Sequence, residues 1–217
     1  MRRPLLCHEC RRELVPPAVA RCGRCAARTG LPTSREVGCP LCTAYPLRFD
    51  RVLTIGSYDA ALREAVLRMK HWRGESLTIA MAELLVECLE TELRALAIDV
   101  VVPVPMHWWR RLRRTTNSAD LLAEVVARHL GKPWHPRLVT RRRSTEPQHL
   151  LSPGQRRRNV RGAFRTSPRL NWRGASALLV DDILTTGSTC SEIARLLKHS
   201  GAAEVNVLVV ARAQGEL

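Results

Sequence analysis

The chain has 217 residues, of which 45% are hydrophobic, and it carries a formal net charge of +15. This length is sufficient for an α/β domain with its own core and a small additional module. The sequence contains no apolar run of about eighteen residues, which excludes a predicted membrane-spanning helix, and we expect a soluble, cytoplasmic protein.

The positive charge is concentrated in one part of the chain. Between Val101 and Arg173 there are seventeen Arg or Lys residues and three acidic residues. A surplus of this kind indicates a polyanionic partner, such as pyrophosphate or nucleic acid. The alternative is a solvated face, although mixed signs of charge would serve solubility better.

The first fifty residues contain three Cys-x-x-Cys pairs, which we consider as candidate zinc ligands: Cys7 and Cys10, Cys22 and Cys25, Cys39 and Cys42. Two such pairs hold one tetrahedral zinc ion, and a site with four thiolates is structural because it leaves no open position. Successive pairs are separated by eleven and thirteen residues, so either pairing is acceptable. Disulfides are the alternative, but they are disfavoured because no feature indicates secretion.

Apolar periodicity predicts the elements that follow the cysteines. Residues 52–58 form a predicted strand, and residues 60–70 and 77–96 form predicted helices. A short strand over 98–105 ends in two prolines, and a helix over 119–130 follows a basic loop.

The basic loop after the 98–105 strand is a candidate anion-binding segment. In an α/β sheet, a loop at the carboxyl end of a strand lies at the edge where ligands bind. The polar residues that we expect to contact pyrophosphate or another polyanion are Arg110, Arg111, Arg113, Arg114 and Asn117.

A second basic segment spans residues 140–164. Its prolines and glycines favour a loop, and its clustered arginines at 141–143 and 156–158 favour contact with a polyanion. For any single arginine, a solvated position is an equally good interpretation.

Residues 177–189 carry the most specific pattern of the chain. A buried strand over 177–180 is followed by Asp181 and Asp182, and a Thr/Gly/Ser loop then opens a helix over 189–199. The start of a helix stabilises phosphate, and carboxylates accept hydrogen bonds from ribose hydroxyls or hold Mg²⁺. A strand over 205–210 completes the predicted sheet.

This stretch resembles the signature of the type I phosphoribosyltransferases. The resemblance implies a parallel sheet flanked by helices over residues 49–217, and the Cys-x-x-Cys pairs predict a zinc-ribbon-like module over 1–48. It implies that Asp181 and Asp182 bind the ribose of phosphoribosyl pyrophosphate with Mg²⁺ and are the catalytic acids. The residues that it assigns to the 5′-phosphate are Thr185, Thr186, Gly187, Ser188 and Thr189.

The order of the motifs narrows the resemblance to the ComF family of competence proteins. Pro103-Val104-Pro105, Arg114 and Asn117 follow the family pattern, whereas Thr115, Thr116 and Ser118 depart from it. The resemblance implies a role in DNA uptake during natural transformation, with single-stranded DNA and the competence machinery as partners. The alternative is an active phosphoribosyltransferase of nucleobase metabolism, although no motif for an acceptor base is evident.

Overall fold

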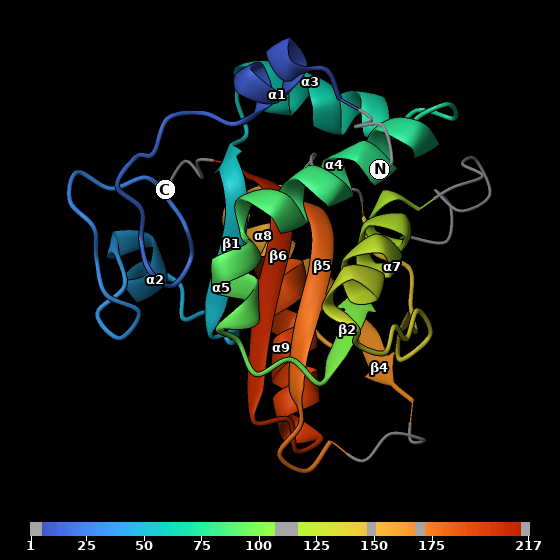
Figure 1. Cartoon of the computed structure of the whole chain (residues 1–217). Coiled ribbons are helices and arrows are strands. Elements are labelled where there is room, and N and C mark those ends of the chain that lie inside the picture. The colour runs from blue at the N-terminus through green and yellow to red at the C-terminus, as the bar shows by residue number, and fades with distance from the viewer. Residues whose placement is uncertain (1–5, 107–116, 147–150, 168–171, 214–217) are drawn as a thin grey trace.

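The computed structural model describes residues 6–106, 117–146, 151–167 and 172–213. Within these ranges, the main sheet has four parallel strands in the order β1-β6-β5-β2. Their bounds are Arg51–Ser57 for β1, Val100–Pro103 for β2, Ser176–Leu184 for β5 and Glu204–Arg212 for β6. Figure 1 shows the strands side by side, with their carboxyl ends at the top.

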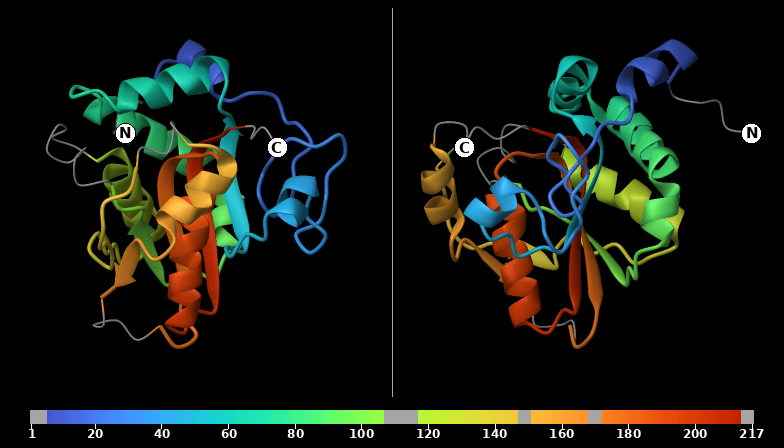
Figure 2. Two further views of the ribbon diagram at one scale, coloured as in Figure 1. Left: turned by 180° about the vertical axis from the view of Figure 1, so that it is seen from behind. Right: turned by 90° about the vertical axis from the view of Figure 1, so that its left-hand side faces the viewer.

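One face of the sheet is covered by helices from the middle of the chain. These are α3 (Ala60–Met69), α4 (Glu75–Cys88), α5 (Glu90–Arg94) and α7 (Ser118–Leu130). The second view in Figure 2 shows the sheet from its side, with α4, α5 and α7 on this face. The pleat explains the packing, because Leu178 and Val180 of β5 both belong to the core on this side.

The opposite face is covered by α9 (Ser188–His199), which follows β5 directly. Alongside α9 lie α8 (Pro153–Val160) and a hairpin formed by β3 (Val139–Arg141) and β4 (Phe164–Thr166). The intervening residues of β5, such as Leu179, join the core on this side together with Ile193 and Leu197 of α9. The fold is therefore a parallel sheet between two helical layers, as predicted.

Two short helices precede β1. Helix α1 (His8–Leu14) lies beside α3, and α2 (Pro40–Ala44) lies beyond the β1 edge of the sheet (Figure 1). The buried residues around α2 belong to the same core as α9, so this part of the chain packs on the domain. In the described parts of the chain, we find no helix with the length and apolar character needed to cross a bilayer.

Three predictions differ in the structure. The segment 140–164, predicted to be a loop, contains the helix α8, which begins with a capping box between Ser152 and Gln155. The predicted helix over 77–96 is interrupted at Leu89, where φ is −120° and ψ is 19°, so α5 runs in a new direction from α4 (Figure 1). The strand predicted over 177–180 continues to Leu184, because β6 pairs with it beyond the two acids, with Asp181 opposite Val209. The acids therefore lie within the strand instead of after it.

Candidate functional site

The loop between β5 and α9 places hydroxyl groups at the first turn of a long helix. Gly187 is the N-cap residue of α9 and has a φ of +73°, which favours glycine. The hydroxyl oxygens of Thr186 and Ser188 lie 2.7 Å apart, and Thr185 and Thr189 are partly exposed. The first amide groups of a helix have no intrahelical partners, so this loop can accommodate an anion.

The two acids of β5 point to opposite faces of the sheet, as neighbours in a strand must. Asp181 is partly exposed, and its Oδ1 accepts a hydrogen bond of 2.9 Å from the amide of Asp182. On the α9 side, burial raises the pKa of the Cys190 thiol, and the charge of Asp181 raises it further. Cys190 is therefore a packing residue rather than a nucleophile.

Asp182 is buried and held by two partners from different helical segments. Its Oδ2 accepts a hydrogen bond of 3.0 Å from the Ser118 hydroxyl and lies 3.1 Å from Nζ of Lys70. Lys70 follows α3, and Ser118 is the first residue of α7. Our sequence analysis assigned no role to either residue, since no local pattern links them to the acids.

The predicted pyrophosphate-binding segment is described only at its end. Arg110, Arg111, Arg113 and Arg114 lie outside the described residues. Asn117 is the N-cap residue of α7, which places the end of the loop next to Ser118 and Asp182. Because β2 pairs with β5, the connection from β2 to α7 leaves from and returns to the same edge of the sheet as the β5–α9 loop.

Four of the six candidate zinc ligands form one cluster. The sulfur atoms of Cys22, Cys25, Cys39 and Cys42 all lie within 4.8 Å of one another, and all four residues are buried. The separations recorded as contacts are 3.7 Å between Cys22 and Cys42, 3.6 Å between Cys25 and Cys39, and 3.9 Å between Cys39 and Cys42. A tetrahedron with Zn–S bonds of about 2.3 Å has edges of about 3.8 Å, so the cluster fits a zinc ion.

The electrostatics of the cluster agree with a metal site. The neighbouring Cys42 thiol and burial together raise the pKa of the Cys25 thiol. Buried thiols that cannot ionise alone become thiolates when a cation binds, so binding releases protons. These four residues could therefore hold a metal ion such as zinc.

The first Cys-x-x-Cys pair is not part of this cluster. Cys7 is the N-cap residue of α1, and its sulfur accepts a hydrogen bond of 3.4 Å from the amide of Cys10. Both residues are exposed. The spacing of the three pairs left the choice of ligands open, and the structure brings only the second and third pairs together.

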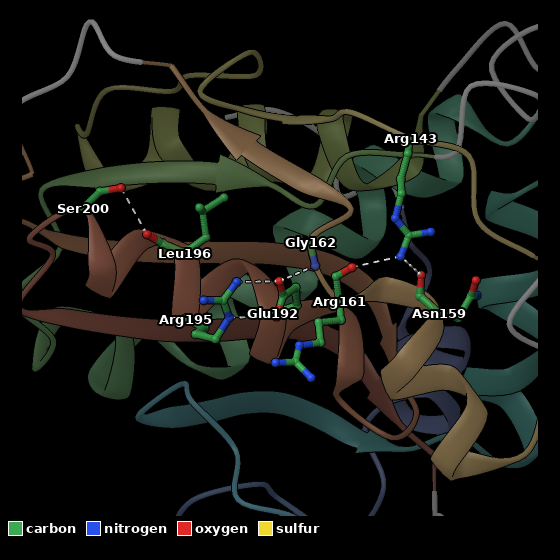
Figure 3. A network of polar contacts seen from close by, with 8 residues as sticks. All are labelled: Arg143, Asn159, Arg161, Gly162, Glu192, Arg195, Leu196 and Ser200. Carbon is green, nitrogen blue, oxygen red and sulfur yellow. Dashed lines mark hydrogen bonds and ion pairs between the residues drawn. The ribbon is translucent and has the colours of Figure 1, made fainter.

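The basic segment over 140–164 is attached to α9 through one carboxylate. Glu192 of α9 accepts a hydrogen bond of 2.7 Å from the amide of Gly162, and it pairs with Arg195 at 2.8 Å (Figure 3). Although burial alone would raise the pKa of Glu192, the hydrogen bonds from Arg195 and Gly162 lower it. This end of the segment is therefore fixed beside α9, the helix that follows the β5–α9 loop.

Some arginines of the segment hold its own backbone. Arg143 donates hydrogen bonds of 2.8 Å and 2.9 Å to the carbonyl oxygens of Asn159 and Arg161 (Figure 3). Arg157 stacks on the ring of Tyr45, 3.8 Å from its centroid. The exposed arginines of this segment are Arg142, Arg143, Arg157, Arg158 and Arg161, and Arg165 just beyond it is also exposed.

The chain is similar in sequence to a known protein family and to several characterised proteins. A model of the phosphoribosyl transferase domain matches residues 74–216, which include both acids and the β5–α9 loop. The DNA utilization protein YhgH of Salmonella typhi is 35% identical over 95% of this chain and 90% of its own length. Competence protein F of Haemophilus influenzae is 30% identical over 96% of this chain and 90% of its own length. Among solved structures, adenine phosphoribosyltransferase from Saccharomyces cerevisiae is 17% identical and covers 63% of this chain and 68% of its own, with a TM-score of 0.40.

Proposed function

Because the chain belongs to the phosphoribosyl transferase domain family, together with DNA utilization protein YhgH and competence protein F, we propose that it binds phosphoribosyl pyrophosphate in the use of DNA taken up during competence. The observation that carries the proposal is the β5–α9 loop, which presents hydroxyls and helix amides a few residues after the partly exposed Asp181. Those groups match the 5′-phosphate and the ribose hydroxyls of this ligand.

In this proposal the two acids have different tasks. Asp181 accepts hydrogen bonds from the ribose hydroxyls, because its side chain is partly exposed. Asp182 uses one oxygen to hold Lys70 and Ser118, which keeps a cation at the site. Mg²⁺ enters with the ligand, since carboxylate and phosphate oxygens are the donors that it prefers. Arg110, Arg111, Arg113, Arg114 and Asn117 contact the pyrophosphate.

Titration calorimetry with phosphoribosyl pyrophosphate and Mg²⁺ tests the ligand. Asp181→Asn is expected to weaken binding by about tenfold or more, because the carboxylate supplies charge-assisted hydrogen bonds. Glu83→Gln on the exposed surface of α4 removes the same charge and should leave the affinity unchanged. Equal affinity of the wild type and Asp181→Asn would contradict the role of this acid.

We propose single-stranded DNA as the partner of the exposed arginines around α8. Binding by phosphate contacts weakens with salt, and for single strands each lost contact reduces the slope by about 0.7. Replacing Arg157 and Arg158 with Gln should therefore flatten the salt dependence of binding to an oligonucleotide. An unchanged slope would exclude these residues from the interface.

Pyrophosphate release separates the proposal from an active transferase. The assay uses the wild-type protein with phosphoribosyl pyrophosphate, Mg²⁺ and each nucleobase in turn. Salt-dependent DNA binding without release supports a ligand-binding role in DNA utilization. Release with a single base and weak DNA binding would favour the metabolic enzyme.

A further inference from the structure

A buried arginine joins the cysteine cluster to the loop that follows β5. Arg212 is the last residue of β6 and is 5% exposed. Its Nε donates a hydrogen bond of 2.9 Å to the carbonyl oxygen of Cys25. Its Nη1 donates to the carbonyl oxygens of Leu184, at 3.1 Å, and of Thr185. One guanidinium therefore contacts both the turn over residues 22–26, which we call the metal-binding turn, and the start of the β5–α9 loop.

Arg212 is a buried cation whose recorded partners are backbone oxygens. Within the described residues, no carboxylate lies within ion-pairing distance of its guanidinium. A buried charge is costly unless it is hydrogen-bonded and compensated. A divalent cation held by four thiolates carries a net negative charge, so the metal centre beside Cys25 supplies the missing compensation.

A second set of contacts connects the same two regions. A side chain at Gly187 would meet the ring of Phe49 at 3.3 Å and the side chain of Leu47 at 3.4 Å, so these residues support the loop from below. Arg24, between Cys22 and Cys25, donates a hydrogen bond of 2.6 Å to the carbonyl oxygen of Leu47. The segment between the cysteine cluster and β1 therefore also connects the metal-binding turn to the β5–α9 loop.

Arg48, which lies between Leu47 and Phe49 in the sequence, also contacts α9. The amide of Arg48 donates a hydrogen bond of 3.1 Å to the hydroxyl of Ser191, in the first turn of α9. Backbone and side-chain contacts thus bracket the β5–α9 loop on both sides. Loss of the metal-binding turn would remove contacts on each side at once.

We propose that Arg212 is a positioning residue through which metal binding at the four-cysteine cluster sets the geometry of the β5–α9 loop. The inference depends on the proposed function only for the identity of the ligand. The contacts that link the cluster to the loop are all within the protein. The metal centre would then act on ligand binding without touching the ligand.

Hydrogen exchange of peptides covering residues 184–191 measures the loop directly. In Arg212→Met, which keeps an unbranched side chain but removes the donors, exchange should be about tenfold faster or more, since several hydrogen bonds from a charged group are lost. The wild type stripped of metal by a chelator should show the same change, and added Zn²⁺ should reverse it. Peptides from α7 report the change in global stability, so the loop effect is the acceleration at 184–191 that exceeds the acceleration in α7.

Arg21→Met is the matched control. Arg21 also contacts the metal-binding turn, because it donates a hydrogen bond of 3.1 Å to the carbonyl oxygen of Ala26. Its other recorded side-chain contact is with Ser57 of β1 and not with the β5–α9 loop. Its replacement should leave exchange of the 184–191 peptides unchanged. Arg212→Lys, which keeps the charge but cannot bridge several oxygens, should lie between the wild type and Arg212→Met.

Metal content, measured for each variant, separates the outcomes. Faster loop exchange in both Arg212→Met and the stripped wild type supports the coupling. Loop exchange that stays unchanged in either of them would overturn it, because the metal would then not act on the loop through Arg212. Calorimetry with phosphoribosyl pyrophosphate is read separately: a wild type that binds no ligand contradicts the proposed function and leaves the exchange result standing.

Discussion

The role of Asp182 is set by two side chains that lie far from it in sequence. Lys70 and Ser118 both contact the same carboxylate oxygen, which leaves the second oxygen for other partners. The side chain of Asp182 is 12% exposed and that of Lys70 is 22% exposed, so the pair is largely shielded from solvent. Such a pair contributes to stability chiefly because neither charge can be left alone.

Lys70→Met is therefore expected to destabilise the protein by about 1–3 kcal/mol, since it leaves the Asp182 carboxylate buried with only one recorded partner. Denaturant unfolding checks the change. Adding Asp182→Asn to Lys70→Met should recover part of the loss, because it removes the uncompensated charge. Lys132→Met, at an exposed position after α7, is the control and should change stability by less than about 0.5 kcal/mol.

For single residues, the sequence predicts the candidate ligands and acids but not the side chains that contact and orient them. The Cys-x-x-Cys spacing marks the ligands because two thiolates of one turn can reach one ion. Which two of the three Cys-x-x-Cys pairs meet depends on how the chain folds, and the spacing within the sequence does not determine this. Lys70 was missed for the same reason, since it follows α3 whereas its partner Asp182 lies on β5, far away in the sequence.

The β5–α9 loop depends on one glycine at the start of the helix. Gly187 has a positive φ and lies against Phe49, so it meets two separate constraints. A residue with a side chain at this φ costs about 1–2 kcal/mol, and the close approach adds to that. The element thus needs glycine both for its turn and for its packing.

Gly187→Ala should destabilise the protein by about 1–2 kcal/mol from strain and by a further amount from contact with Phe49. Gly131→Ala is the matched variant, because Gly131 has a φ of +63° and open space around it. Denaturant unfolding of both variants isolates the packing contribution. Equal destabilisation would show that Phe49 moves aside without cost.

Periodicity predicted most of the elements, and the exceptions have physical causes. The strand at 177–180 was predicted too short because carboxylates are rare inside strands, whereas pairing with β6 extends the ladder past them. The break at Leu89 was missed because both halves of the 77–96 segment have helical patterns. Its position is set by packing on the sheet, which the pattern does not contain.

The cysteine-rich part of the chain shares a core with the α9 side of the sheet, while a second core lies on the other face. The four clustered cysteines belong to the core on the α9 side together with Phe49, Ile193 and strand residues. We propose that residues 1–48 and 49–217 form two functional parts, but the shared core favours unfolding as one unit. The cysteine cluster and the β5–α9 loop would then be lost together.

Metal removal is accordingly expected to lower the Tm of the full chain by about 10 °C, since structural zinc contributes several kcal/mol to folding. Calorimetry with and without chelator should show a single transition in both cases. Two separate transitions in the stripped protein would contradict a shared core and indicate an independently folding domain.

The strand order also constrains how the protein is made. β6 lies between β1 and β5 although it follows both in sequence. During synthesis, β1 therefore cannot pair with β6 until almost every described residue has been translated. Until then the edges of β1 and β5 are available to other nascent chains. Arg212 is the last residue of the same strand, so synthesis of β6 completes both the sheet and the contact with the cysteine cluster.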